Sequence, residues 1–172
     1  MKKHNGMRPQ DVVILLKILT CKDCPWTFAE LALSLHISSS MVSESLERNR
    51  IAGLVNHSKN QVNKLALREF LIYGLKYVFP AQLGFSTRGI ITAHSAPPVS
   101  NFINEGRENY VWAYYKGTRI GNSIVPLYEK IPKFIENDPE LYEYLAIVDT
   151  FRIGKNREVD IAVNELDKRL RI

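Results

Sequence analysis

The chain has 172 residues, of which 45% are hydrophobic and 10% aromatic, enough to build the core of one compact domain or two small ones. It has no apolar run near the roughly 20 residues that span a bilayer, and no small-residue cleavage site follows its first apolar run. With only two cysteines, these features argue against a membrane protein and a secreted disulfide scaffold, and they predict a cytoplasmic protein.

The formal net charge of +5 is distributed unevenly. Residues 1–80 carry 11 basic and 6 acidic side chains, whereas residues 81–172 carry 12 of each. A basic excess confined to one half is typical of a surface that contacts phosphates, and ordinary surface charge is the alternative.

The first predicted element is a helix. Pro9 suits a first helical turn, and the apolar residues from Val12 to Leu19 predict a strongly apolar helix that ends near Cys21. Cys21 and Cys24 have the spacing of zinc and thiol-exchange sites, but no second cysteine pair or paired histidine motif follows. We interpret the pair as half-buried residues in a turn, with redox sensing as the alternative, and we predict no metal site.

Residues 27–55 have the pattern of two helices joined by a short turn. Thr27 and Glu30 form a T-x-x-E capping box that starts the first of these helices. Ser38 caps the second, which we expect from about Ser39 to Arg50. The second helix leaves a short polar face free, and such a face can enter a major groove.

The same segment carries the pattern L-A-x-x-L-x-[IV]-S-x-x-x-V-S, then a leucine and G-L-V. Its residues are Leu31-Ala32, Leu35, Ile37-Ser38, Val42-Ser43, Leu46 and Gly53-Leu54-Val55. In this pattern the chain resembles winged helix-turn-helix transcription regulators of the multiple-antibiotic-resistance (MarR) type, over roughly residues 9–80. The resemblance implies a winged helix that binds double-stranded DNA, and the stretch from Leu54 to Asn63 suits the small hairpin or loop of a wing. Symmetric dimers read palindromic sites, so we also expect a homodimer.

These features give a set of candidate DNA contacts. The base-edge candidates are Ser39, Ser40, Ser43, Glu44 and Glu47, and the phosphate candidates are Arg48, Arg50, Lys59 and Lys64. A glutamate accepts from cytosine N4 but repels phosphates, so Glu44 and Glu47 also keep an alternative open. The alternative is a protein-interaction adaptor or antitoxin-like subunit that binds a basic partner. We do not expect an enzyme.

From Leu65 to Phe79, a broad apolar face at helical spacing predicts a helix that ends at Pro80. Glycines and prolines punctuate residues 80–109. They predict an irregular connection with one short strand at Ile90-Ile91.

That connection contains the most chemically dense loop of the chain. Arg88, Thr92 and His94 are its candidates for binding an effector, because they combine a forked cation, a hydroxyl and an imidazole in a short span. The alternative is a buried loop whose polar side chains satisfy its own backbone. No order of nucleophile, base and carboxylate surrounds His94, so no catalytic residue is assigned.

The rest of the chain predicts a hairpin and two helices. Aromatic and β-branched residues from Tyr110 to Tyr115, a turn and residues 118–120 indicate the hairpin. Asp138-Pro139 caps a helix that ends at Gly154, and a final helix runs from about 156 to 170.

Four charged residues flank the turn between the last two helices. Asp149 and Arg152 are three residues apart on a helix and can pair, and Arg157 with Glu158 can clamp the turn. We interpret the group as a structural ionic corner, with an effector or partner contact as the alternative.

The predicted fold class is therefore α+β and mostly helical. Residues 1–80 form a winged helix-turn-helix DNA-binding domain, and residues 81–172 form a small α+β module for dimerisation or for binding an effector or partner. That effector is either a small molecule or a protein, and no cofactor is expected.

Overall fold

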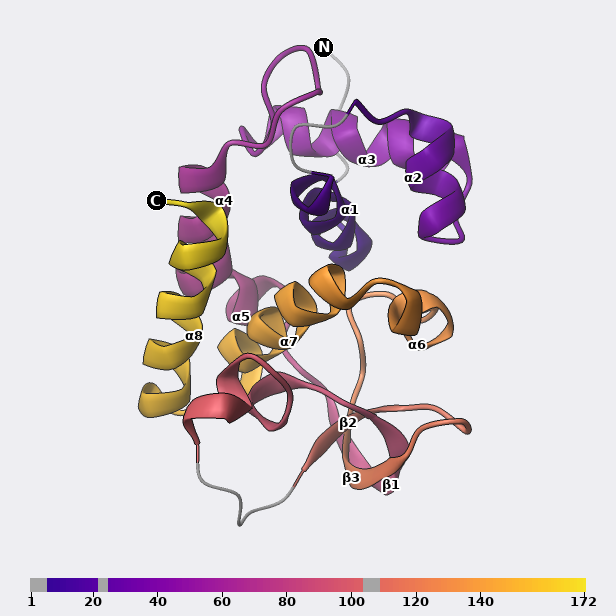
Figure 1. Ribbon diagram of the computed structural model, residues 1–172. Coiled ribbons are helices and arrows are strands. Elements are labelled where there is room, and N and C mark those ends of the chain that lie inside the picture. The colour runs from indigo at the N-terminus through magenta and orange to yellow at the C-terminus, as the bar shows by residue number, and fades with distance from the viewer. Residues whose placement is uncertain (1–5, 22–24, 104–108) are drawn as a thin grey trace.

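The computed structural model describes residues 6–21, 25–103 and 109–172. Its upper layer in Figure 1 consists of α1 (Pro9–Thr20), α2 (Phe28–Ser34) and α3 (Ser39–Ile51). The predicted capping box is present, since Thr27 N donates to Glu30 Oε2 at 2.7 Å and Glu30 N donates to Thr27 Oγ1 at 3.2 Å. Ser38 Oγ accepts from Met41 N at 3.2 Å and caps α3. These three helices are confirmed within a residue or two of their predicted bounds.

A short loop follows α3. An antiparallel bridge between Val55 and Val62 closes it, which confirms the predicted small hairpin or loop. Inside the loop, Asn56 Oδ1 accepts from the backbone N–H of Asn60 at 3.1 Å and of Gln61 at 3.3 Å. One side chain therefore holds the loop in a fixed shape.

The next helical segment is continuous from residue 64 to residue 78. It consists of α4 (Lys64–Glu69), a π-helical turn (Phe70–Gly74) and α5 (Leu75–Val78). The predicted helix and its end before Pro80 are confirmed, although the π turn was not predicted.

A small three-stranded sheet lies at the opposite end of the molecule from α3 (Figure 1). Its strands are β1 (Leu83–Ile91), β2 (Tyr110–Ala113) and β3 (Arg119–Ile124). β1 is antiparallel to both partners, with Ile90 opposite Trp112 and Arg88 opposite Ile120, and β2 runs parallel to β3. Each strand pairs with the other two, so the sheet is closed.

Two expectations for this region were wrong. The supposed irregular connection contains a nine-residue strand, β1, instead of a short strand at Ile90-Ile91. The supposed hairpin is absent because β2 and β3 are parallel neighbours that both pair with β1. The turn between them passes very close to β1: a Cβ added to Gly117 would lie 2.2 Å from the carbonyl carbon of Gly89.

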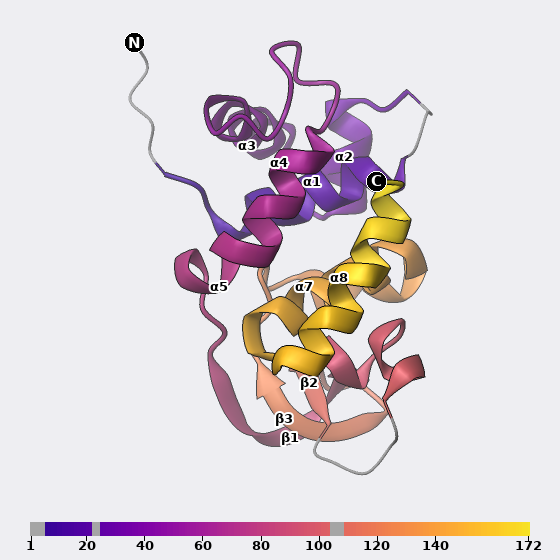
Figure 2. The ribbon, with the colours of Figure 1, turned by 90° about the vertical axis from the view of Figure 1, so that its left-hand side faces the viewer.

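The remaining helices connect the sheet to the first layer. They are α6 (Ile131–Phe134), α7 (Pro139–Ile153) and α8 (Asn156–Leu170), and short 3-10 turns lie at Ala93–Ser95, Val99–Phe102 and Ile135–Asn137. Asp138 caps α7, with Leu141 N donating to its Oδ1 at 3.1 Å. Both long helices are confirmed at their predicted positions. Figure 2 shows α7 lying between α1 and the sheet, with α8 beside α4.

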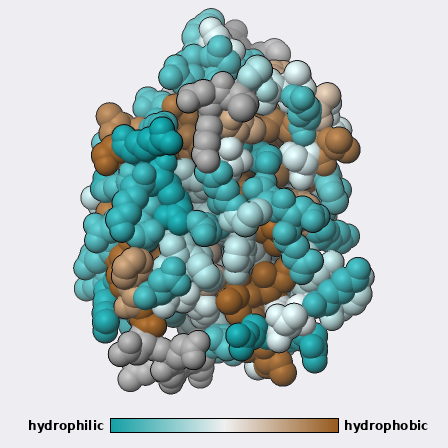
Figure 3. Space-filling model, viewed as in Figure 1, coloured by the Kyte–Doolittle hydropathy of each residue, from teal (hydrophilic) through white to brown (hydrophobic). Residues whose placement is uncertain are grey.

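The buried apolar side chains form one core that extends across both halves of the chain. The segment Val12–Leu16 of α1 and the segment Leu145–Val148 of α7 are buried, and the two helices are in contact. Figure 3 shows a mostly hydrophilic face with separate small hydrophobic patches. In the described ranges, no helix has both the length and the apolarity needed to cross a membrane. The coarse fold class, α+β and mostly helical, is confirmed.

Candidate nucleic-acid interface

The outer side of α3 gathers four of the predicted base-edge residues. Ser39, Ser40, Ser43 and Glu44 are all exposed, and they follow one another along the first turns of the helix. The Glu44 side chain is 60% exposed, and its contact with Arg48 is long, at 3.8 Å. Three hydroxyls and one accessible carboxylate therefore face outward together.

Glu47, the fifth base-edge candidate, connects α3 to the loop that follows it. Its carboxylate binds Arg50 Nη2 at 2.9 Å and Lys59 Nζ at 2.6 Å. Hydrogen bonds from these two cations lower the pKa of Glu47 to about 2. Arg50 and Lys59, two of the phosphate candidates, thus direct their charge to Glu47.

Arg48 does not reach the surface, so its predicted phosphate contact is wrong. Its side chain is 9% exposed, and it forms a two-point contact with Asp11, from Nε to Oδ2 and from Nη2 to Oδ1, both at 2.7 Å. The hydrogen bonds that Arg48 donates to Asp11 raise the pKa of Arg48 above its ordinary value. This pair locks α3 onto α1, because a buried guanidinium needs a fully bonded partner.

Lys64 is also placed differently from the prediction. It begins α4, and its Nζ donates to the carbonyl of Leu170 at 2.9 Å, at the end of α8. It therefore joins the two halves of the chain instead of extending from the loop toward phosphates.

The basic excess of residues 1–80 is partly neutralised by the second half. Arg68 binds Asp167 at 2.5 Å, and Lys17 binds Asp138 at 2.6 Å. Among the described residues of α3 and the loop 56–61, the outward cations are both paired with Glu47. The segregation of charge along the sequence thus overstates the charge of the α3 face.

The three effector candidates are not brought together. Thr92 is fully buried, and its hydroxyl donates to Asp149 Oδ2 at 2.9 Å, so its predicted role in effector binding is wrong. Arg88 is exposed and donates to the Gly117 carbonyl at 3.3 Å. His94 is half-buried and lies edge-on against Tyr110, and burial lowers its pKa.

Asp149 is the centre of the predicted ionic corner. Arg152 Nη1 donates to its Oδ1 at 2.7 Å, which confirms the Asp149–Arg152 pair. Its Oδ2 also accepts from Trp112 Nε1 at 2.7 Å and from the Thr92 hydroxyl. Burial raises the pKa of Asp149, and these donors oppose that rise. The spacing of Asp149 and Arg152 predicted only their pair, because Trp112 and Thr92 are distant in sequence.

The structure tests the interpretation of the two cysteines only for Cys21. Cys21 is half-buried and its Sγ donates to the Lys17 carbonyl at 3.4 Å, whereas Cys24 lies outside the described residues. Within the described part of the chain, no cluster of three or more histidine, cysteine or acidic side chains is arranged to hold a metal.

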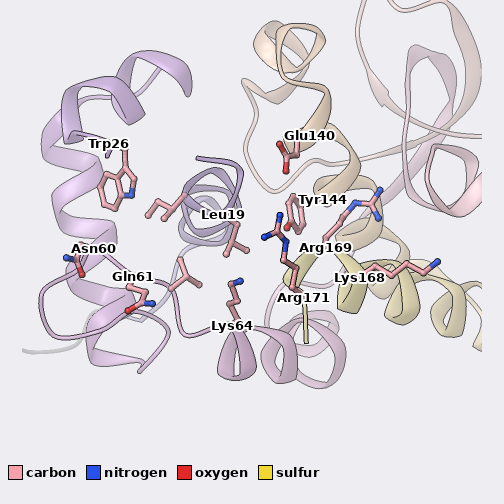
Figure 4. A pocket seen from close by; sticks show the side chains of 12 residues that line it. Leu19, Trp26, Asn60, Gln61, Lys64, Glu140, Tyr144, Lys168, Arg169 and Arg171 are labelled. Atoms are coloured by element: carbon pink, nitrogen blue, oxygen red, sulfur yellow. The ribbon is translucent and has the colours of Figure 1, made fainter. Parts of the chain in front are cut away.

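A cleft of about 640 Å³ lies between the two halves of the chain (Figure 4). Sequence reasoning missed it, because its walls come from segments far apart in the chain. Its lining residues are Ile18, Leu19, Trp26, Asn60, Gln61, Val62, Lys64, Glu140, Tyr144, Lys168, Arg169 and Arg171. The available signal was the cluster of basic residues near the C-terminal end.

No protein-family model, curated protein or solved structure matches this chain.

Proposed function

We propose that residues 1–80 form a winged helix-turn-helix that binds double-stranded DNA, and that the protein regulates transcription in the cytoplasm as a homodimer. The observation that carries this proposal is the open polar side of α3, with the loop 56–61 beside it. In helix-turn-helix proteins the second helix of the motif enters the major groove. Here α3 would be that helix, and the loop would be the wing.

The exposed side chains suit base readout. The hydroxyls of Ser39, Ser40 and Ser43 can donate or accept, so they tolerate any base. Glu44 can only accept, which favours cytosine through its N4 amino group. The buried Arg48–Asp11 pair supports this role indirectly, because it fixes α3 firmly on α1.

The test is fluorescence anisotropy of the full chain on its own upstream DNA and on scrambled DNA, across a salt series. A specific regulator should separate the two DNAs by at least about 10³ in affinity. Replacing Glu44 by alanine should then cost about 1–3 kcal/mol of discrimination at one cytosine position. Glu69→Ala, an exposed change on α4, is the matched control. Equal binding to both DNAs, seen only at low salt, would contradict the proposal.

A protein-interaction adaptor is the second candidate, and one observation favours it. The outward cations of α3 and its loop are paired with Glu47, so the described surface there is close to neutral and Glu44 remains accessible. Glu44→Lys separates the two functions. It should tighten non-specific DNA binding if this face meets DNA, and it should weaken capture of a basic partner if the face meets protein.

A further inference from the structure

The cleft between the two halves has the dimensions of a small-molecule site. Leu19 of α1 lies at its centre in Figure 4, with Trp26 and the loop residues Asn60 and Gln61 along one side. Tyr144 of α7 and the end of α8 form the opposite side. Small-molecule sites are commonly clefts of roughly 300–1,000 Å³ in which a few polar groups accompany aromatic and apolar side chains.

Two cations point into this cleft. Lys64 and Arg171 are directed toward its centre in Figure 4, whereas Arg169 and Lys168 turn away from it. Arg169 is already bound to Glu165 at 2.8 Å, and to Glu143. Among the residues that the structure describes, no carboxylate lies within ion-pair distance of Lys64 or Arg171.

Those two cations favour an anion that carries more than one charge. Lys64 Nζ donates to a neutral group, the Leu170 carbonyl, at 2.9 Å. Glu140 is the single acidic side chain among the described lining residues, and Figure 4 places it beyond Tyr144. A phosphate monoester, with a charge near −2 and three acceptor oxygens, matches a lysine and an arginine better than a carboxylate does.

The opposite side of the cleft suits a planar, hydrogen-bonding group. Trp26 offers an indole ring, which stacks against Phe28 at a centroid distance of 6.2 Å. Gln61 offers an amide that can donate and accept at once. Asn60 offers the N–H groups of its amide, because its Oδ1 already accepts from Asn56 Nδ2 at 2.7 Å. A nucleobase has both a face for an aromatic ring and an edge for an amide.

We propose that this cleft binds a nucleoside monophosphate, with its phosphate between Lys64 and Arg171 and its base against Trp26, Asn60 and Gln61. This inference goes beyond the proposed function and does not depend on DNA binding by α3. The loop that would serve as the wing forms part of the site, so a bound nucleotide would also contact that loop.

The experiment is isothermal titration calorimetry of the full chain with 5′-AMP, adenosine and inorganic phosphate. AMP should bind saturably, and at least about tenfold more tightly than either part alone. Arg171→Gln should weaken AMP by about tenfold and leave adenosine unchanged, because it removes one phosphate contact. Trp26→Ala should weaken adenosine and leave phosphate unchanged. The control is Lys133→Gln, an exposed change on α6 that removes the same charge elsewhere.

Two results would overturn the proposal. One is the absence of saturable AMP binding by a protein whose circular dichroism and melting temperature are normal. The other is an equal loss in Arg171→Gln and Lys133→Gln, since binding would then follow net charge alone. A 5′-phosphorylated oligonucleotide identifies the source of the ligand: if it displaces AMP, the site takes a nucleic-acid end, and if it does not, the site takes a free nucleotide. Because DNA is absent from the first titrations, their failure would leave the proposed function untouched.

Discussion

The buried carboxylate of Asp149 ties α7 to the sheet and to both segments that lead into and out of it. Asp149 accepts hydrogen bonds from Trp112, Thr92 and Arg152. Arg152 also donates to three backbone carbonyls, those of Phe79, Pro80 and Val125. The side chains of Asp149 and Arg152 are 2% and 4% exposed. Solvent therefore cannot replace a lost partner.

We predict that Asp149→Ala lowers the free energy of unfolding by about 3–5 kcal/mol, because it leaves a buried guanidinium without its counter-ion. Urea denaturation measures this loss. Asp160→Ala on the exposed side of α8 serves as the control, with an expected change within about 0.5 kcal/mol. A loss below about 1 kcal/mol for Asp149→Ala would mean that the backbone carbonyls alone stabilise Arg152.

His94 should make stability depend on pH. Burial lowers its pKa below the usual 6.5, and its Nδ1 is buried without a hydrogen-bond partner among the described residues. The folded state therefore favours neutral imidazole. The contribution of neutral His94 to the free energy of unfolding is fully present above pH 6.5. It is lost as the pH falls through the lowered pKa of His94 in the folded state.

The prediction is that His94→Phe flattens the fall in melting temperature between pH 7 and pH 5, since the ring contact with Tyr110 is kept and the titrating group is removed. Differential scanning calorimetry at several pH values measures it. The exposed change His57→Gln should leave the wild-type profile intact. Parallel profiles for wild type and His94→Phe would rule out this origin of the pH dependence.

At the scale of elements, Glu47 is the link between α3 and the loop 56–61. We predict that Glu47→Gln frees Arg50 and Lys59, and that DNA binding then depends more steeply on salt. The slope of log K against log [salt] should steepen by about 0.9 for each freed cation that reaches a phosphate. Anisotropy titrations between low and moderate salt measure the slope. Glu69→Gln removes the same charge from α4, and an equal change in both variants would show that only net charge matters.

Helices were predictable here because their signals are local. Pro9, the Thr27 capping box and Asp138-Pro139 each lie within four residues of the helix end that they specify. The sheet was not predictable, because β1 pairs with two strands that lie about 20 to 40 residues away in the sequence. Most side chains of β1 are also exposed. An exposed strand with glycines has no alternating pattern to reveal it.

The candidate sites were also predictable only where the signal was local in the sequence. The exposed serines of α3 were correctly placed on its outer side, since helical periodicity alone decides that. Arg48 was misplaced because its partner, Asp11, is 37 residues away and lies on another helix. Lys64 and Arg171 line the same cleft although they are far apart in the sequence. Lys64 is hydrogen-bonded to Leu170, the residue before Arg171, which is 106 positions away. No local sequence pattern predicts such a contact.

At the scale of the whole molecule, one core joins the two predicted domains. α1 packs against α2 and α3 and also against α7, and α4 packs against α8. The division at residue 80 stays a prediction about function, since the buried side chains extend across it.

We predict that a fragment of residues 1–80 lacks a cooperative thermal transition, because the parts of α1 and α4 that face α7 and α8 would be exposed to water. Circular dichroism melting and binding of a hydrophobic dye measure this. The full chain should melt in a single sharp transition. A sharp transition in the fragment would show that the first half folds without the second.

The close approach of Gly89 and Gly117 has a consequence for how the sequence can change over generations. Any other residue at Gly89 would place its Cβ 2.1 Å from the Trp112 carbonyl oxygen, and at Gly117 the obstacle is again main chain. A clash between two side chains can be relieved by making one of them smaller. A clash with backbone atoms cannot be relieved by any substitution at the other position. Both positions should therefore stay glycine in every working descendant of this gene, while the exposed neighbour Lys116 can vary.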